Sequence, residues 1–304
     1  MIDTNKCKWK YGKQAPVVIM MDDLCNKYMT DRSDGGYLGA DWGGMCDAEN
    51  SWYQFVKHNI FDKYPYVRMT CFLVTGRRED LIIDGKSNIS LAMDETEQFR
   101  EFIKKLSKDE HIELAYHGYT HGHCSKDNNP DGFIQEWDTF VSVEDAVDVI
   151  AKGKKLYEDI VGESFKGGKY CGYRRNAFSD ESIVRSGFLY WCRHWDNVQN
   201  GINGESLDME MFDGVVDIPS SVDGNLFSLR EWKHLFTREY VKAMYRKLRY
   251  NVTLEKTLDG LVKNGQVISI QSHTSPIRED NKRQYPNVID DIDNIIYILE
   301  YLKK

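Results

Sequence analysis

The sequence predicts an α/β fold in which strands and helices alternate within one domain. Short runs of β-branched and aromatic residues recur along the chain, and longer stretches with a helical pattern separate them. No internal repeat and no segment rich in Pro, Gly or Ser divides the chain. The length of 304 residues is large for an ordinary domain but fits a single α/β barrel. We therefore expect residues 1–304 to form one domain.

Seven strands are expected where β-branched and aromatic residues cluster. They are Val17–Met21, Val67–Val74, Ile112–Tyr116, Lys169–Tyr173, Phe188–Cys192, Val215–Ile218 and Val267–Ser272. Six helices are expected around them, at Ala48–Phe61, Asp94–Leu106, Val143–Val161, Asp180–Arg185, Thr237–Lys263 (with a break allowed) and Val288–Leu302. This set of elements fits either a closed barrel or a doubly wound open sheet.

The expected helix at Val143–Val161 has the clearest boundaries. Ser142 can cap its first turn, and Gly162 follows its last apolar residue. The longest irregular segment, residues 26–50, contains five glycines and four aspartates. A loop of this length inside a compact domain is usually functional or mobile, so we expect it on the active face of the fold.

Charge and composition exclude several classes of partner. The chain carries 48 acidic residues against 40 Lys and Arg, and this net charge of −8 argues against nucleic-acid binding and gives no reason to expect an anionic membrane surface. The longest apolar run, Ala15–Met21, is too short to span a bilayer. The seven cysteines form no CxxC pair, and no apolar stretch follows the basic N-terminal residues, so we expect reduced thiols and a cytoplasmic protein.

Polar side chains follow four of the expected strands. Asp22 and Asp23 end the first, the histidine pair in His117–His121 ends the third, Arg174 ends the fourth, and His273 ends the last. The ends of parallel strands meet at one edge, where active sites of α/β proteins are assembled. The spacing of the two histidines lets both imidazoles point the same way. Two imidazole nitrogens and one carboxylate oxygen suit a divalent ion such as Zn²⁺, and the second carboxylate is then free to act as a base.

The four motifs resemble those of the polysaccharide deacetylases, the NodB-homology group that is also called carbohydrate esterase family four. They are MMDD at 20–23, HGYTH at 117–121, GYRRNAF at 172–178 and IQSH at 270–273, in the order and relative placing of the family's motifs. The resemblance implies a distorted (β/α) barrel, often seven-stranded, with one divalent metal ion, for which we expect Zn²⁺. Two positions depart from the family pattern, because Leu24 stands where Gly is usual and Asn176 where Pro is usual.

The resemblance also implies a role for each site residue. Asp23, His117 and His121 would ligate the metal, and Asp22 would be the catalytic base. Arg174 would hold that base, His273 would be the catalytic acid, and the backbone N–H of Ala177 would stabilise the oxyanion. Asp196 or Asp217 would tune His273. Trp42 and Tyr119, in loops of the active face, are candidates to stack on a sugar ring.

The implied function is removal of an N-acetyl group from a sugar, with surface polysaccharide biosynthesis as a setting. Two alternatives stay open. One is a hydrolase of another small amide on the same fold. The other is a catalytically silent carbohydrate-binding protein, whose signature would be loss of Asp22, Arg174 or His273, all of which are present.

Overall fold

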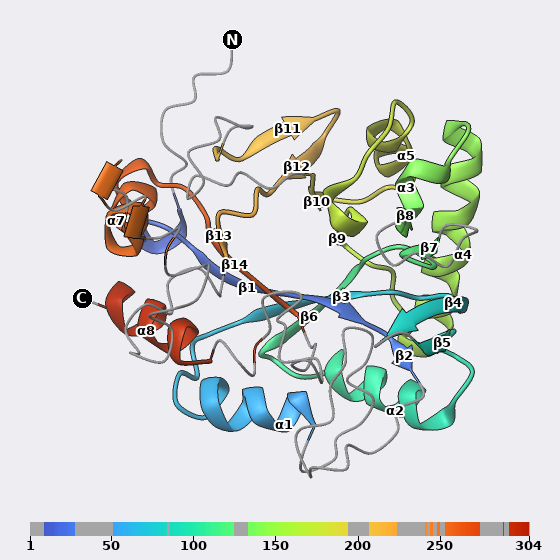
Figure 1. The fold of residues 1–304 in the computed structure, drawn as a ribbon, viewed down its shortest axis with the longest axis horizontal. Coiled ribbons are helices and arrows are strands. Elements are labelled where there is room, and N and C mark those ends of the chain that lie inside the picture. Colours follow the sequence, from blue (N-terminus) through green and yellow to red (C-terminus); the bar gives the residue numbers. More distant parts are fainter. Residues whose placement is uncertain are drawn as a thin grey trace.

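One sheet of nine strands lies at the centre of the molecule, in the order β11-β12-β10-β9-β6-β3-β1-β14-β13 (Figure 1). The structure, a computed structural model, describes residues 9–27, 51–83, 86–124, 133–193, 207–223, 253–273 and 292–303, together with residues 241, 244, 245, 248, 249 and 288. The strands are β1 (Val17–Leu24), β3 (Met69–Leu73), β6 (Ile112–Tyr116), β9 (Gly167–Lys169), β10 (Tyr190–Cys192), β11 (Glu210–Phe212), β12 (Val215–Asp217), β13 (Val222–Asp223) and β14 (Ile268–His273). Neighbouring strands are parallel except β11 and β12. Six of the seven expected strands are confirmed in this sheet, the one expected at Lys169–Tyr173 shares only Lys169 with β9, and β11 and β13 are additional.

The sheet is rolled up, because its two ends are joined by a very short piece of chain. Strands β12 and β13 lie near opposite ends of the strand order, yet only residues 218–221 separate them. The Cα atoms of Asp217 and Val222 can therefore be at most about 17 Å apart. Within this piece, the Ile218 N–H donates to the carbonyl of Trp191 on β10, and the Ser221 N–H donates to Ser269 Oγ on β14. The chain thus passes from one end of the sheet to the other, which confirms the distorted barrel over the open sheet.

At the top of Figure 1 lie β11 and β12, and helices cover the other sides of the barrel. They are α1 (Trp52–Val56), which continues as a π-helical turn at Lys57–Phe61, α2 (Glu97–Leu106), α3 (Glu136–Thr139), α4 (Val143–Val161), α5 (Ser179–Arg185), α7 (Leu254–Asn264) and α8 (Ile292–Leu302). The bounds of α4 are those expected: Ser142 Oγ accepts the Asp145 N–H, and Gly162 has a φ of 88°. Ser51, Thr96 and Thr253 cap α1, α2 and α7 in the same way. Helices α1 and α2 therefore begin after the expected first residue, whereas α7 follows the break allowed within Thr237–Lys263, because residues 241, 244, 245, 248 and 249 are also helical.

Two small antiparallel sheets flank the strand ends and were not expected. One contains β2 (Asn26–Lys27), β4 (Arg78–Ile83) and β5 (Lys86–Leu91). The other pairs β7 (Gly122–Cys124) with β8 (Phe133–Gln135). Of the long loop expected at 26–50, residues 28–50 lie outside the described residues.

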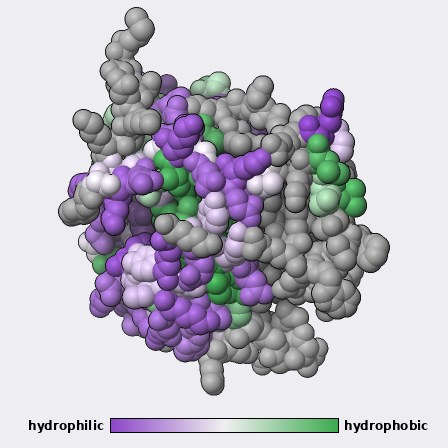
Figure 2. Space-filling view, turned by 90° about the vertical axis from the view of Figure 1, so that its left-hand side faces the viewer, coloured by the Kyte–Doolittle hydropathy of each residue, from purple (hydrophilic) through white to green (hydrophobic). Residues whose placement is uncertain are grey.

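Apolar side chains from the barrel and the helices form one large buried core. Its bulkiest fully buried members include Trp52, Tyr116, Trp137, Tyr170 and Trp191. Viewed from the side that carries α7 and α8, the coloured residues are mainly hydrophilic, with small hydrophobic patches between them (Figure 2). Among the described residues, no helix has both the length and the apolar character needed to cross a bilayer.

Candidate active site

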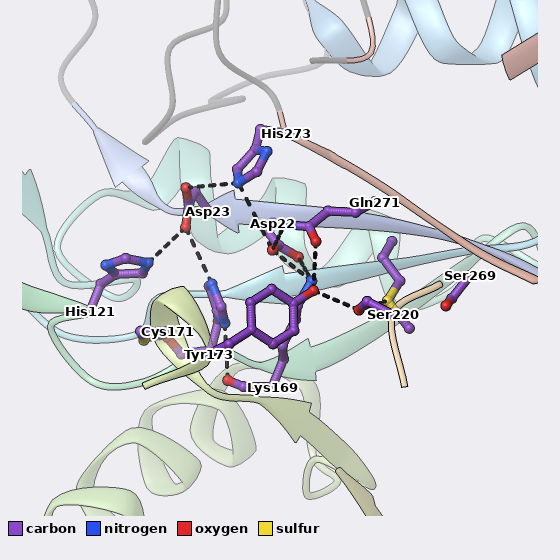
Figure 3. A network of polar contacts seen from close by, with 12 residues as sticks. Asp22, Asp23, His121, Lys169, Cys171, Tyr173, Ser220, Ser269, Gln271 and His273 are labelled. Carbon is purple, nitrogen blue, oxygen red and sulfur yellow. Dashed lines mark hydrogen bonds and ion pairs between the residues drawn. The ribbon is translucent and has the colours of Figure 1, made fainter. Parts of the chain in front are cut away.

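Asp22 and Asp23 are adjacent in the sequence, and both contribute a buried carboxylate to one site. Neighbouring residues of a regular strand point to opposite faces. The pairing of β1 with β3 shifts between Met21 and Leu24, and Asp23 has a φ of 66°, in the left-handed region. This irregularity turns the Asp23 side chain toward that of Asp22. His273 Nε2 lies 3.9 Å from Asp22 Oδ2 and 3.8 Å from Asp23 Oδ2, so both carboxylates face the same imidazole (Figure 3).

The two histidines at the end of β6 face Asp23. Asp23 Oδ1 lies 3.3 Å from His117 Nε2 and 3.1 Å from His121 Nε2, and all three side chains are buried. His121 also has a positive φ, 67°. Burial by itself would raise the Asp23 pKa, but His121, His117 and His273 outweigh it and hold the pKa well below its usual value. The structure thus brings together Asp23, His117 and His121, the ligand set expected from the sequence.

The hydrogen bonding of His117 fits a cation at this point. Its Nδ1 lies 3.0 Å from the Lys169 carbonyl oxygen, which can only accept, so Nδ1 carries the hydrogen. In the neutral ring, the lone pair of Nε2 then faces the Asp23 carboxylate, and these two acceptors repel each other unless a proton on Nε2 or a metal cation lies between them. Two ligand atoms on a tetrahedral Zn²⁺ lie roughly 3.3–3.5 Å apart, close to the distances found here. The carbonyl contact also orients the ring, as is usual for metal-bound histidine.

Cys171 offers a second ligand set that shares both histidines. Ligand atoms of His117, His121 and Cys171 lie within 4.8 Å of one another, and the three residues are buried. In the structure the Cys171 thiol donates to the His117 carbonyl oxygen over 2.8 Å. A thiolate ligand could not make that bond, so metal binding through Cys171 requires its loss. The set with Asp23 needs no such change.

Lys169 and Gln271 hold the Asp22 carboxylate. Lys169 Nζ lies 2.9 Å from Asp22 Oδ1 and 2.7 Å from Oδ2, and Gln271 Nε2 donates to Oδ2 over 3.3 Å. The ammonium group also lies 5.2 Å from the centre of the Phe72 ring and 4.7 Å from that of Tyr173. The Tyr173 hydroxyl is 2.6 Å from Gln271 Oε1 and 2.6 Å from Ser220 Oγ (Figure 3). This network fixes the carboxylate from several directions.

Arg174 does not occupy the place expected for it. Its Nε donates to Asp138 Oδ2 over 3.0 Å, and 64% of its side chain is exposed. The physical reason is that β9 ends at Lys169, and a 3-10 turn at Cys171–Tyr173 carries the chain away from the sheet. Both Gly172 and Tyr173 have left-handed backbones, with φ of 54° and 55°. Lys169 therefore makes the contact to Asp22 that the sequence analysis assigned to Arg174.

The remaining expected residues are placed as follows. Ala177 lies in an exposed turn just before α5. Tyr119 is half-buried, and its ring packs so closely on Gly76 that a Cβ there would lie 2.6 Å from it. Trp42 and Asp196 lie outside the described residues. Asp217 forms an ion pair of 2.7 Å with Arg193.

Glu136 and Lys169 were missed by the sequence analysis. Glu136 is buried beside the histidine loop, and burial raises its pKa although three backbone N–H groups, those of Tyr119, Thr120 and His121, oppose the shift. The available signal for Lys169 was its position in an expected central strand, where a lysine is seldom buried without a partner. For Glu136, the sequence offers no comparable signal, because its contacts depend on how residues 122–135 fold.

The comparisons with known proteins concern the fold. No protein-family model matches the sequence, and no curated protein matches it either. A structure described as a polysaccharide deacetylase from Mycobacterium smegmatis superimposes with a TM-score of 0.50 and 13% identity, covering 96% of this chain and 86% of that one. The PuuE allantoinase superimposes with a TM-score of 0.53 and 13% identity, covering 98% and 87%. The similarity seen in the four motifs thus extends to the whole architecture, and the chain has the distorted-barrel fold of the polysaccharide deacetylases.

Proposed function

We propose that the protein is a metal-dependent hydrolase that removes an N-acetyl group from a sugar. The observation that carries the proposal is the convergence of the Asp23 carboxylate with two imidazole Nε2 atoms, at 3.3 and 3.1 Å, beside a second buried carboxylate. Asp23, His117 and His121 would hold the ion. A divalent cation such as Zn²⁺ supplies Lewis acidity and lowers the pKa of water.

Asp22 and His273, which lie beside the proposed metal site, each carry out one of the two proton transfers. Asp22 accepts a proton from the water that attacks the acetamide carbon, and Lys169 and Gln271 keep its carboxylate in place. His273, in its protonated form, gives a proton to the departing amine. The products are acetate and an amino sugar. We assign stabilisation of the oxyanion to the backbone N–H of Ala177, and stacking on the sugar to Trp42 and Tyr119.

We further propose a cytoplasmic setting in surface polysaccharide biosynthesis, in which the cysteines of the chain stay reduced. The alternative substrate, another small amide, is supported by the similarity of the fold to that of an allantoinase.

Metal loading followed by acetate assays tests the proposal. Purified protein should bind one equivalent of Zn²⁺ or Co²⁺ and release acetate from a panel of N-acetylated sugars. Asp22→Asn should keep the metal and lose at least about 100-fold in kcat, the usual scale for a general base. Asp138→Asn, which alters a carboxylate paired with the exposed Arg174, is the control and should remain active.

The outcomes separate the three functions. Metal binding without acetate release, but with hydrolysis of other small amides, favours the alternative substrate. Sugar binding without any turnover identifies a silent carbohydrate-binding protein. Full activity of the Asp22→Asn variant would show that another group is the base.

A further inference from the structure

Glu136 is a buried carboxylate on which three consecutive backbone N–H groups converge. Its Oε1 accepts from the Tyr119 N–H over 3.0 Å. Its Oε2 accepts from the Thr120 N–H over 2.6 Å and from the His121 N–H over 2.9 Å. The Thr120 hydroxyl adds a fourth contact to Oε2, at 3.2 Å. These donors belong to the loop that connects the two histidines of the site.

The β7–β8 hairpin brings Glu136 back to this loop. Gly122 pairs with Gln135, so the chain that leaves the loop at His121 returns to it at Glu136. The Glu136 N–H then donates to the His121 carbonyl over 3.1 Å. Glu136 and His121 are therefore joined in both directions, through the backbone of one and the side chain of the other.

The loop has a backbone that needs such an anchor. Gly118 has a φ of 96° and His121 a φ of 67°, and a non-glycine residue in this region is strained. Successive N–H groups that point into one hollow form an anion-binding nest, and here the anion is the protein's own carboxylate. The fit is close, because a Cβ added to Gly118 would lie 3.0 Å from Glu136 Oε2 and 2.9 Å from Cys171 Sγ.

We propose that Glu136 is a positioning residue of the metal site, an inference that rests on the proposed function. By fixing the N–H of His121 in a left-handed conformation, the carboxylate sets the direction in which that imidazole leaves the loop. The His121 Nε2 then lies 3.1 Å from Asp23 Oδ1. Without the carboxylate, three N–H donors would be left in a buried nest, and the loop would relax to satisfy them. Glu136 touches neither substrate nor the reacting atoms, so its effect is on ligand geometry.

Cobalt spectroscopy of Glu136→Gln tests this inference. The substitution keeps the size of the side chain but places an NH₂ group against N–H donors. We expect Co²⁺ to bind about 10- to 100-fold more weakly, the usual loss when a ligand-orienting partner is removed, and its visible absorption spectrum to change. The matched control is Asp217→Asn, which alters another buried carboxylate that accepts a backbone N–H, that of Arg193. This control should lose thermal stability but keep the cobalt spectrum of the wild type.

The results separate this inference from the proposed function. An unchanged spectrum and affinity in Glu136→Gln, with normal cobalt binding by the wild type, would overturn the positioning role alone. A wild type that binds no cobalt would overturn the proposed function, and the inference with it. If the glutamine variant does not fold, Thr120→Val removes one donor to Oε2 and carries the test: weaker cobalt binding supports the inference, and unchanged binding overturns it.

Discussion

Lys169 is the residue whose loss should damage the site most without removing a proposed ligand. Its ammonium group is fully buried and contacts both oxygens of Asp22. Lys169→Met would leave the carboxylate buried without its cation, at a cost of about 3–5 kcal/mol in the free energy of unfolding. We also expect a large loss of kcat, because the base would no longer be held. Chemical denaturation and acetate release measure the two effects.

Arg174→Met is the matched control for this prediction. The ion pair of Arg174 with Asp138 is largely exposed, and such pairs contribute about 0–1 kcal/mol. This variant should therefore keep both its stability and its activity. Loss of activity in Arg174→Met with full activity in Lys169→Met would restore the role first expected for the arginine.

Tyr173 should affect catalysis through Gln271. Its hydroxyl lies 2.6 Å from Gln271 Oε1, and because that oxygen can only accept, this bond turns the amide NH₂ toward Asp22. Tyr173→Phe should lower kcat about three- to tenfold, the worth of one net hydrogen bond, with little change in KM. Tyr170→Phe is the control, since its hydroxyl bonds to Asp180 instead. Equal kcat values for the two variants would contradict the prediction.

At the scale of single elements, the strand-end rule placed the site where the expected strand boundary was nearly right. Asp22 and Asp23 directly follow an apolar run, and they are the two residues before Leu24, the last residue of β1. The strand expected at 169–173 stops at Lys169, so the rule applied to the true boundary identifies Lys169 instead of Arg174. The end of this strand was not predicted, because the turn that follows it needs a left-handed φ at Tyr173, which a tyrosine rarely adopts. The position of this strand boundary thus decided whether Lys169 or Arg174 was assigned to the Asp22 carboxylate.

Among the contacts between secondary-structure elements, the one between β13 and β14 should be the most sensitive to a single substitution. Ser269 Oγ accepts the Ser221 N–H over 2.8 Å and donates to the Pro219 carbonyl over 2.6 Å. Ser269→Ala would leave both groups buried without these partners, and we expect a loss of about 1–3 kcal/mol in the free energy of unfolding. Ser182→Ala removes one local bond, from its Oγ to the Ser179 carbonyl, and should cost less. If Ser182→Ala lost more stability than Ser269→Ala in a urea titration, the result would argue against closure of the barrel between β13 and β14.

At the scale of the whole molecule, the alternation of strands and helices was enough to predict the α/β class, and the resemblance supplied the barrel. The two antiparallel additions were not predicted, although the sequence has Asp-Gly, a pair typical of two-residue hairpin turns, at 84–85. The closure itself could not be derived from local pattern. It depends on residues 218–221, which hydrogen-bond to β10 at one end and to β14 at the other. Tertiary packing determines this pairing, and the β-propensity of the residues does not.

Metal removal should lower the stability of the whole barrel. A metal that binds only the native state adds about 2.7 kcal/mol at a free concentration 100 times its Kd, so a chelator should lower the Tm. Asp23→Asn should abolish this dependence, because it replaces the carboxylate that faces both imidazoles. Cys171→Ser should preserve it. The opposite pattern, with metal protecting Asp23→Asn but not Cys171→Ser, would place the ion on the set formed by Cys171 and the two histidines. Calorimetry with and without chelator distinguishes the two, since each ligand set loses its stabilisation in a different variant.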